Sequence, residues 1–404
     1  MGEPGNDCLM NRIIRLTASL LFLLTLSCVR AGVPPGSGGA RRILTPAGFP
    51  ADESYFPIAV WLQSPKNAER FSAAGINLYV GLWKGPTEEQ LAELKKANMP
   101  VICSQNSVAR AHLNDPLIAA WMHGDEPDNA QSLKNGKGYG PPILPEVIAK
   151  DFETLRKSDP TRPVLLNLGQ GVAFDNYIGR GVRRNHMEDY PLYVKGCDIV
   201  SFDIYPVVHE SPEVKGKLEF VPRGVERLVK WTEGKKPVWT CIECTDIDGV
   251  GRKASPAQVK AEVWMALIRG SRGLIYFVHQ FKPDFKEAAL LSDPAMLPAV
   301  TAINQQIKDL APVLNSETLT DALTVETKGE SARSPVSAIL KSRDGAAYVF
   351  AANFQSEPAT VVFTLKKGEA EGATVLGESR KITLADGRFT DHFEGYGVHL
   401  YQLK

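Results

Sequence analysis

The stretch Trp121-Met-His-Gly-Asp-Glu-Pro127 joins a short apolar run to two adjacent carboxylates. This pattern is typical of a buried strand that ends in a polar loop. A second apolar run, Pro237-Val-Trp-Thr-Cys-Ile-Glu243, ends in another glutamate. Because an unpaired carboxylate is costly to bury, a glutamate in such a run indicates either a structural partner or a function. We therefore ask which fold would bring Glu126 and Glu243 together.

Strand and helix signals alternate between residues 51 and 312. Two of the helical segments open with a capping box, Thr87 to Gln90 and Ser255 to Gln258. The expected strands are residues 56–61, 76–81, 100–103, 119–123, 163–168, 198–205, 237–243 and 273–278. The expected helices are residues 67–74, 87–97, 146–158, 224–233, 255–270 and 295–310, with room for only a minimal helix between the third and fourth strands.

Eight strand–helix units predict a closed (β/α)8 TIM barrel over residues 51–312. This length allows about 32 residues for each unit, which is its usual size. Strands that are apolar throughout indicate a parallel sheet covered on both faces. In such a barrel the carboxyl ends of all strands lie at one face, where active sites are built. Glu126 follows the fourth strand and Glu243 ends the seventh, so both are expected at that face.

The sequence pattern changes in residues 313–404. Short alternating runs at residues 346–352, 360–365 and 397–403 are separated by turn signals such as Asp344-Gly345. This predicts a small antiparallel β-sandwich domain. We expect it to pack against the barrel, and carbohydrate binding by this domain is an open alternative.

The first 31 residues have the pattern of a signal peptide. Arg12 and Arg15 precede an apolar run at residues 16–27 that is too short to span a bilayer. Residues 32–50 are rich in Gly, Pro and Arg and are expected to form a flexible lead-in. We therefore expect a secreted, periplasmic or cell-surface protein with no membrane span.

The cysteines predict no disulfide framework. Cys28 could carry a lipid anchor, but the residues before it match the usual lipidation motif poorly, so this is the less favoured alternative. Cys241 and Cys244 on one strand would be about 10 Å apart, too far for a disulfide. Buried free thiols are therefore expected at Cys103, Cys197, Cys241 and Cys244.

Composition and motifs exclude several classes of function. The 404 residues include 46 basic and 46 acidic side chains, and no basic run is interleaved with aromatics, so nucleic acid is not an expected partner. No His-x-His or His-Glu-x-x-His spacing is present, so no metal site is predicted. No cofactor is predicted either, and nothing in the sequence indicates the oligomeric state.

The barrel and its two glutamates resemble clan A of the retaining glycoside hydrolases. In that clan an acid/base glutamate follows the fourth strand in an Asn-Glu-Pro context, and a nucleophilic glutamate ends the seventh. Gly124-Asp-Glu-Pro127 matches the first motif, except that Asp125 replaces the asparagine that holds the sugar 2-hydroxyl. The resemblance implies that Glu126 is the acid/base, Glu243 the nucleophile, and Tyr205 a hydrogen-bond partner of Glu243.

These observations predict an exported retaining glycoside hydrolase that cleaves a β-linked oligo- or polysaccharide. Structural interpretations remain for each residue: Asp125 could cap a helix, Glu243 could form a buried ion pair, and Tyr205 could be a core aromatic. A non-catalytic carbohydrate-binding barrel is the second hypothesis, and a metal-dependent hydrolase on the same fold is the third.

Other polar and aromatic residues near strand ends are candidates for substrate contacts. Aromatic rings could stack on sugars, and amides or imidazoles could bond hydroxyls, although core or structural roles are the alternative for each. The candidates are Trp61, Trp83, Asn106, Asn167, Tyr276 and His279.

Overall fold

The computed structural model describes residues 48–133, 136–249, 251–327, 334–366 and 370–404. The predicted signal peptide, Cys28 and most of the predicted lead-in lie outside these residues. No helix within the described ranges is long and apolar enough to cross a membrane.

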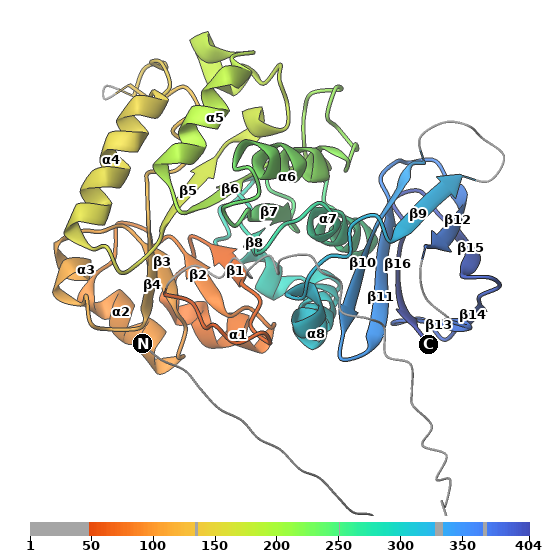
Figure 1. Cartoon of the computed structure of the whole chain (residues 1–404). Coiled ribbons are helices and arrows are strands. Elements are labelled where there is room, and N and C mark those ends of the chain that lie inside the picture. Colours follow the sequence, from red (N-terminus) through yellow and green to blue (C-terminus); the bar gives the residue numbers. More distant parts are fainter. Residues whose placement is uncertain (1–47, 134–135, 250, 328–333, 367–369) are drawn as a thin grey trace, which may run out of the picture. The chain divides into compact units, whose positions relative to one another are not determined.

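Eight parallel strands form the first sheet, with neighbours in the order β6-β5-β4-β3-β2-β1-β8-β7. A parallel bridge between Val200 and Val238 links β6 to the approach of β7 and closes the ring. Figure 1 shows this ring with helices around its outside. The predicted TIM barrel is confirmed. Its strands are β1 (Ile58–Trp61), β2 (Leu78–Val80), β3 (Val101–Cys103), β4 (Ile118–Met122), β5 (Val164–Leu168), β6 (Ile199–Phe202), β7 (Thr240–Glu243) and β8 (Leu274–Phe277).

The helices follow the strands as the sequence pattern requires. Both predicted capping boxes are formed: the Gln90 amide nitrogen donates to Thr87 Oγ1 at 3.2 Å, and that of Gln258 donates to Ser255 Oγ at 3.3 Å. The α-helices are α1 (Ala68–Ala73), α2 (Glu88–Lys96), α3 (Ser107–Ala111), α4 (Pro145–Ser158), α5 (Tyr190–Tyr193), α6 (Phe220–Trp231), α7 (Pro256–Ile268) and α8 (Met296–Leu314).

The connection between β5 and β6 departs from a simple strand–helix unit. It contains the four-residue α5 and four short 3-10 segments in place of one regular helix. These segments are η2 (Gln170–Val172), η3 (Ile178–Arg183), η4 (Met187–Asp189) and η5 (Val194–Gly196). Two other short 3-10 segments are η1 (Pro65–Asn67) and η6 (Ala289–Ser292).

Alternate strand residues face the barrel interior and the surrounding helices. Trp61, Trp239 and Cys241 belong to the interior cluster, whereas Ile242 and Tyr276 belong to the cluster that also includes helix residues. Because both faces of each strand are buried, the strand sequences are apolar without alternation. All four cysteines of the described barrel are buried and free, as predicted.

The C-terminal strands form two antiparallel sheets, which confirms the predicted β-sandwich. The five-stranded sheet has the order β10-β11-β16-β13-β14 and the three-stranded sheet the order β15-β12-β9. Phe363 and Phe389 stack between strands of the smaller sheet, with ring centroids 4.6 Å apart. The strands are β9 (Leu323–Thr327), β10 (Val336–Arg343), β11 (Ala346–Asn353), β12 (Ala359–Leu365), β13 (Gly372–Val375), β14 (Lys381–Thr383), β15 (Arg388–Phe393) and β16 (Val398–Leu403).

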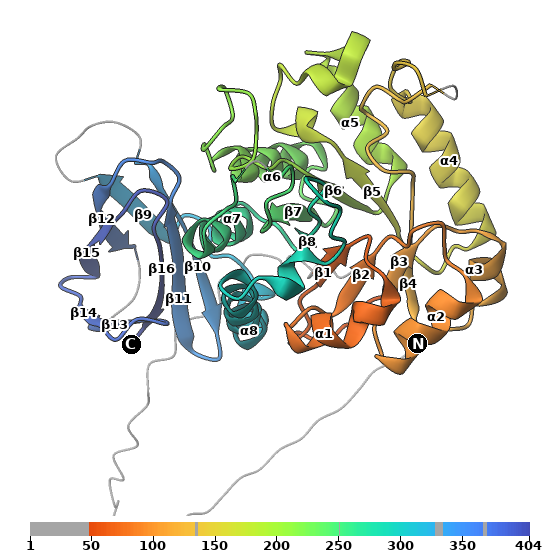
Figure 2. The same cartoon turned by 180° about the vertical axis from the view of Figure 1, so that it is seen from behind.

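The larger sheet packs against α7 and α8 of the barrel, as both views show (Figures 1 and 2). Trp264 of α7 contacts Phe350 of β11, with ring centroids 5.2 Å apart. Lys341 of β10 is buried at this junction and donates a hydrogen bond to the Ser316 carbonyl at 2.7 Å. Burial lowers the pKa of Lys341 to about 7.

This buried lysine predicts a specific pH dependence of stability. Between about pH 7 and 10 the unfolded chain carries a proton on Lys341 that the folded protein does not. The free energy of unfolding should therefore rise with pH, with a contribution from this residue of about 1 kcal/mol per pH unit. Lys341→Met should remove that contribution, as measured by urea unfolding of both proteins at several pH values. Identical pH dependence in the two proteins would contradict the buried, neutral lysine.

Candidate active site

Three carboxyl-bearing residues meet around one amide at the carboxyl ends of β4, β5 and β6. Asn167 Nδ2 of β5 donates to Asp125 Oδ1 at 2.9 Å and to Asp203 Oδ2 at 3.3 Å. Its Oδ1 accepts a hydrogen bond from Ser201 Oγ at 2.7 Å, which fixes the orientation of the amide. Because one nitrogen contacts both carboxylates, these two oxygens are at most about 6 Å apart. Glu126 completes the cluster.

Glu126 is held in an uncommon backbone conformation. Its φ is 42°, in the left-handed region, and its amide donates to the Asn167 carbonyl at 3.2 Å. Its side chain lies close to Gly169, where an added Cβ would sit 2.8 Å from Glu126 Oε1. A side chain at position 169 would therefore displace the ends of the Glu126 and Asn129 side chains. Strained residues of this kind cluster at functional sites.

The cluster perturbs the proton affinity of its members. Burial raises the pKa of Glu126 to about 7, helped by the charges of Asp125 and Asp128. Burial also raises the pKa of Asp203 well above its usual value, and the charge of Glu126 and a hydrogen bond with it add to this rise. These effects favour the protonated form of Asp203, which can donate a hydrogen bond to Glu126. The pKa of Asp125 rises to about 6 through burial, although the residue is open to solvent.

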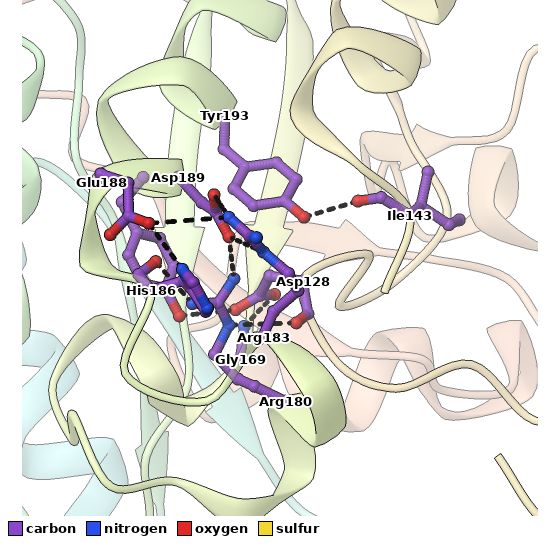
Figure 3. A network of polar contacts seen from close by, with 10 residues as sticks. Asp128, Ile143, Gly169, Arg180, Arg183, His186, Glu188, Asp189 and Tyr193 are labelled. Carbon is purple, nitrogen blue, oxygen red and sulfur yellow. Dashed lines mark hydrogen bonds and ion pairs between the residues drawn. The ribbon is translucent and has the colours of Figure 1, made fainter. Parts of the chain in front are cut away.

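Asp128 anchors the loop that carries Asp125 and Glu126. It is fully buried and accepts hydrogen bonds from the Gly169 amide at 2.8 Å and from the Tyr190 hydroxyl at 3.0 Å. Arg180 donates to the Asp128 carbonyl and to Asp189 Oδ2, and Figure 3 shows this network. The irregular connection between β5 and β6 thus positions the loop that follows β4.

Glu243 lies in a different environment. It has no exposed surface, and its two oxygens accept the Val207 and Val208 amides at 2.7 and 3.1 Å. Glu262 of α7, also fully buried, lies beside it. Burial raises the pKa of Glu243 to about 7, and burial together with the charge of Glu243 raises that of Glu262.

Glu243 and Glu126 therefore have different polar partners. The described contacts join Glu126 to Asp203 and its neighbours, and they join Glu243 to Glu262 and to the loop after β6. A nucleophile must reach a sugar carbon, and Glu243 lacks the accessible surface that this requires. In this structure Glu243 holds the loop after β6, and its nucleophilic role stays a prediction.

A pocket of ≈ 600 Å³ opens beside the carboxyl cluster, between the loops that follow β5, β6 and β7. Tyr177 and Tyr205 line it. Burial raises the pKa of both tyrosines, and the charges of Glu126 and Asp203 raise it further. These two tyrosines lie between the pocket and the cluster, whose residues Asp125, Glu126 and Asp203 do not themselves line the pocket. Its volume suits a small molecule or a few sugar residues.

Trp83 and His279, which are also predicted to contact substrate, follow the carboxyl ends of β2 and β8. Trp83 is 66% exposed on the loop after β2. His279 is buried and contacts Gln63 Nε2 at 3.1 Å. Tyr205 contacts Phe277, with ring centroids 5.0 Å apart. Among the described residues Glu243 accepts hydrogen bonds from the Val207 and Val208 amides, and none comes from Tyr205. Asn167, as described, lies at the centre of the cluster.

The remaining predicted contacts have structural roles. Trp61 is buried in the barrel interior. The Tyr276 hydroxyl donates to Asn304 Oδ1 of α8 at 2.9 Å, so this side chain points away from the barrel interior. Asn106 caps α3 by accepting the Ala109 amide at 2.9 Å. These three residues do not join the carboxyl cluster.

Sequence interpretation missed three residues of these clusters. Asp203 lies within the expected strand 198–205, two residues after the inward-facing Ser201, so alternation along the strand could have identified it. Glu262 directly precedes the apolar run Val263-Trp-Met-Ala-Leu-Ile268. An acidic residue beside such a run is also a detectable signal. Tyr177 lies in an irregular loop and gives no such signal. Among the described residues, no group of three or more His, Cys, Asp or Glu side chains is arranged to hold a metal ion.

Comparison with known proteins extends the fold assignment. No family model matches the sequence, and no curated protein matches it. An AmyP variant in complex with maltotriose aligns with 87% of this chain and 97% of its own, at 10% identity and a TM-score of 0.51. A structure described as a glycoside hydrolase aligns with 86% and 92%, at 12% identity and a TM-score of 0.50. An endoxylanase from Clostridium papyrosolvens aligns with 86% and 96%, at 11% identity and a TM-score of 0.46.

At this level of identity the similarity concerns the fold. The alignments with TM-scores of 0.50 and 0.51 span most of both chains, so they include the barrel together with the C-terminal strands. The chain therefore has a barrel and β-sandwich fold that is also found among glycoside hydrolases.

Proposed function

We propose that this protein is a glycoside hydrolase in which Glu126 is the general acid/base and Asp125 is the nucleophile. One observation carries the proposal: a proton-sharing carboxyl cluster lies at the open end of a (β/α)8 barrel, beside a pocket of ≈ 600 Å³. Active sites of this fold are built at that end. Glycosidic hydrolysis needs one protonated and one ionised carboxyl group at such a place.

Glu126 has the properties of the acid. With a pKa of about 7, it is partly protonated near neutral pH and can give its proton to a leaving oxygen. Its side chain is partly exposed, whereas Asp203 is 8% exposed. Asp203 is therefore better placed to support Glu126 through their shared hydrogen bond than to contact substrate.

Asp125 has the properties of the ionised partner. It is exposed, its pKa of about 6 leaves it mostly ionised near neutral pH, and Asn167 holds one of its oxygens. Asn167 Nδ2 also joins Asp125 Oδ1 to Asp203 Oδ2, so Asp125 lies within about 6 Å of the residue that neighbours Glu126. We propose double displacement because Gly124-Asp-Glu-Pro127 resembles the acid/base motif of the retaining clan A.

The proposed reaction has two steps. Asp125 attacks the anomeric carbon while the bond to the leaving oxygen breaks, and Glu126 protonates that oxygen. Glu126 then takes a proton from water, whose oxygen attacks the same carbon and releases Asp125. The carboxylates return to their initial protonation states, so the cycle consumes only water.

The substrate we propose is a β-linked oligo- or polysaccharide. The linkage is supported by the match of Gly124-Asp-Glu-Pro127 to the acid/base motif of clan A. The carbohydrate class is supported by the aromatic lining of the pocket and, by analogy of fold, by the structural neighbour bound to maltotriose.

We further propose that the protein is exported, because residues 16–27 form a short apolar run behind two arginines. Mass spectrometry of the protein from an exporting host should find a mature chain that begins at Gly32. A full-length chain retained in the cytoplasm would contradict export.

The catalytic assignment predicts the effect of two substitutions. Glu126→Gln removes the transferable proton and Asp125→Ala removes the nucleophile, so each should lower kcat/KM by about 10²–10⁴-fold. The measurement is turnover of a panel of aryl glycosides and polysaccharides. Added azide should partly restore turnover in Asp125→Ala, because a small anion can occupy the vacated space.

Glu262→Gln and Glu243→Gln are matched controls, since each also exchanges a buried carboxyl for an amide. Glu262→Gln should keep kcat/KM within a few-fold. Glu243→Gln should mainly raise KM, because an amide can accept only one of the two backbone N–H groups and loosens the loop that lines the pocket.

If Glu243→Gln abolishes turnover while Asp125→Ala remains active, the nucleophile is Glu243 and the assignment is wrong. Absence of turnover by the unmodified protein on every substrate would favour a binding barrel.

A further inference from the structure

A short hairpin after β8 presents two aromatic side chains to solvent. Phe281 is 48% exposed and Phe285 is 62% exposed. The Gln280 and Lys286 backbones exchange hydrogen bonds of 3.0 and 2.8 Å, and the Phe281 amide donates to the Ile247 carbonyl at 2.7 Å. The hairpin is therefore held both internally and against the loop after β7. Neighbouring exposed rings form an apolar surface of the kind that marks interaction sites.

The orientation of these rings is set by a buried neighbour. His279 is 4% exposed, and its Nε2 contacts both Gln63 and the Leu62 carbonyl. The His279 ring is nearly parallel to Phe281 and Phe285, at interplanar angles of 7° and 24° and centroid distances of 6.0 and 6.1 Å. Phe281 and Phe285 are themselves 6.0 Å apart at 21°. The two exposed rings thus share one orientation.

A row of rings connects this hairpin to the pocket. Phe281 contacts Phe277 at the end of β8, with centroids 6.0 Å apart. Phe277 contacts Tyr205 at 5.0 Å, and Tyr205 lines the pocket beside the carboxyl cluster. The hairpin therefore continues the surface of the proposed active site away from the loops after β5 and β6.

We propose that Phe281 and Phe285 form a platform that binds sugar residues of a polysaccharide chain beyond the bond being cleaved. The faces of sugar rings carry C–H groups, which pack favourably on the electron-rich faces of aromatic rings. The hairpin carries two lysines and one aspartate (Lys282, Lys286 and Asp284), a nearly balanced set that suits a neutral chain. This inference rests on the proposed function and adds a substrate class: polymers rather than single terminal sugars.

If the platform binds outer sugars, removing its two rings should lower kcat/KM by a factor that depends on substrate length. Phe281→Ala/Phe285→Ala should lower kcat/KM on a polysaccharide about tenfold or more, because the outer sugars lose their contacts. Its kcat/KM on an aryl monoglycoside should stay within about twofold, since that substrate does not reach the hairpin. Leu192→Ala, which removes an exposed apolar side chain (45% exposed) from α5, is the matched control and should change neither value. Equal losses on both substrates would overturn the platform.

A binding measurement separates this inference from the catalytic proposal. Affinity electrophoresis of the Glu126→Gln protein in gels containing soluble xylan, galactomannan, mixed-linkage β-glucan or starch needs no turnover. Retention by at least one polymer should be lost when Phe281 and Phe285 are also replaced by alanine. Unchanged retention overturns the platform and leaves the catalytic proposal standing. Absence of retention on every polymer also overturns it, even if aryl glycosides are hydrolysed.

Discussion

The structure depends on how several carboxyl groups are held together at one end of the barrel. Burying like charges close together is unfavourable. For each carboxyl group here, a different interaction or protonation state offsets that cost. Asp203 keeps a proton, Asp128 accepts hydrogen bonds from Gly169 and Tyr190 near Arg180, and Asp125 shares the amide of Asn167 while remaining open to solvent. Glu126 is left with a pKa of about 7. This difference in pKa between neighbouring carboxyl groups is the property that acid/base catalysis requires.

The same physics explains the contacts of Glu243. A glutamate at the end of a barrel strand can turn toward the substrate or toward unpaired backbone groups of a neighbouring loop. Here the amides of Val207 and Val208 offer two hydrogen bonds, and burial together with the charge of Glu243 raises the pKa of the neighbouring Glu262. The result is an anchor for a loop whose residues Val208 and His209 line the pocket. Glu243 therefore acts on the site through the loop.

The barrel could be predicted from the sequence because its signals are periodic and local. Apolar runs and two capping boxes fixed the order of the elements, and both boxes are formed. The position of Asp125, Glu126 and Asn167 at strand ends could also be predicted from the sequence. The direction of each side chain was not, because it depends on strand register: Ile275 faces the interior, whereas its neighbour Tyr276 bonds to α8. The irregular connection that anchors Asp128 has no periodic pattern, so its contribution required the structure.

The most direct test is the protonation of Glu126 itself. Carboxyl-carbon NMR of glutamate-labelled protein, with the signal assigned by its absence in Glu126→Gln, gives the pKa without any substrate. It should be near 7, well above the ordinary glutamate value of 4.5, and Asp125→Asn should lower it because the charge of Asp125 raises it. A midpoint near 4.5 that does not respond to Asp125→Asn would contradict the proton-sharing cluster and the catalytic role based on it.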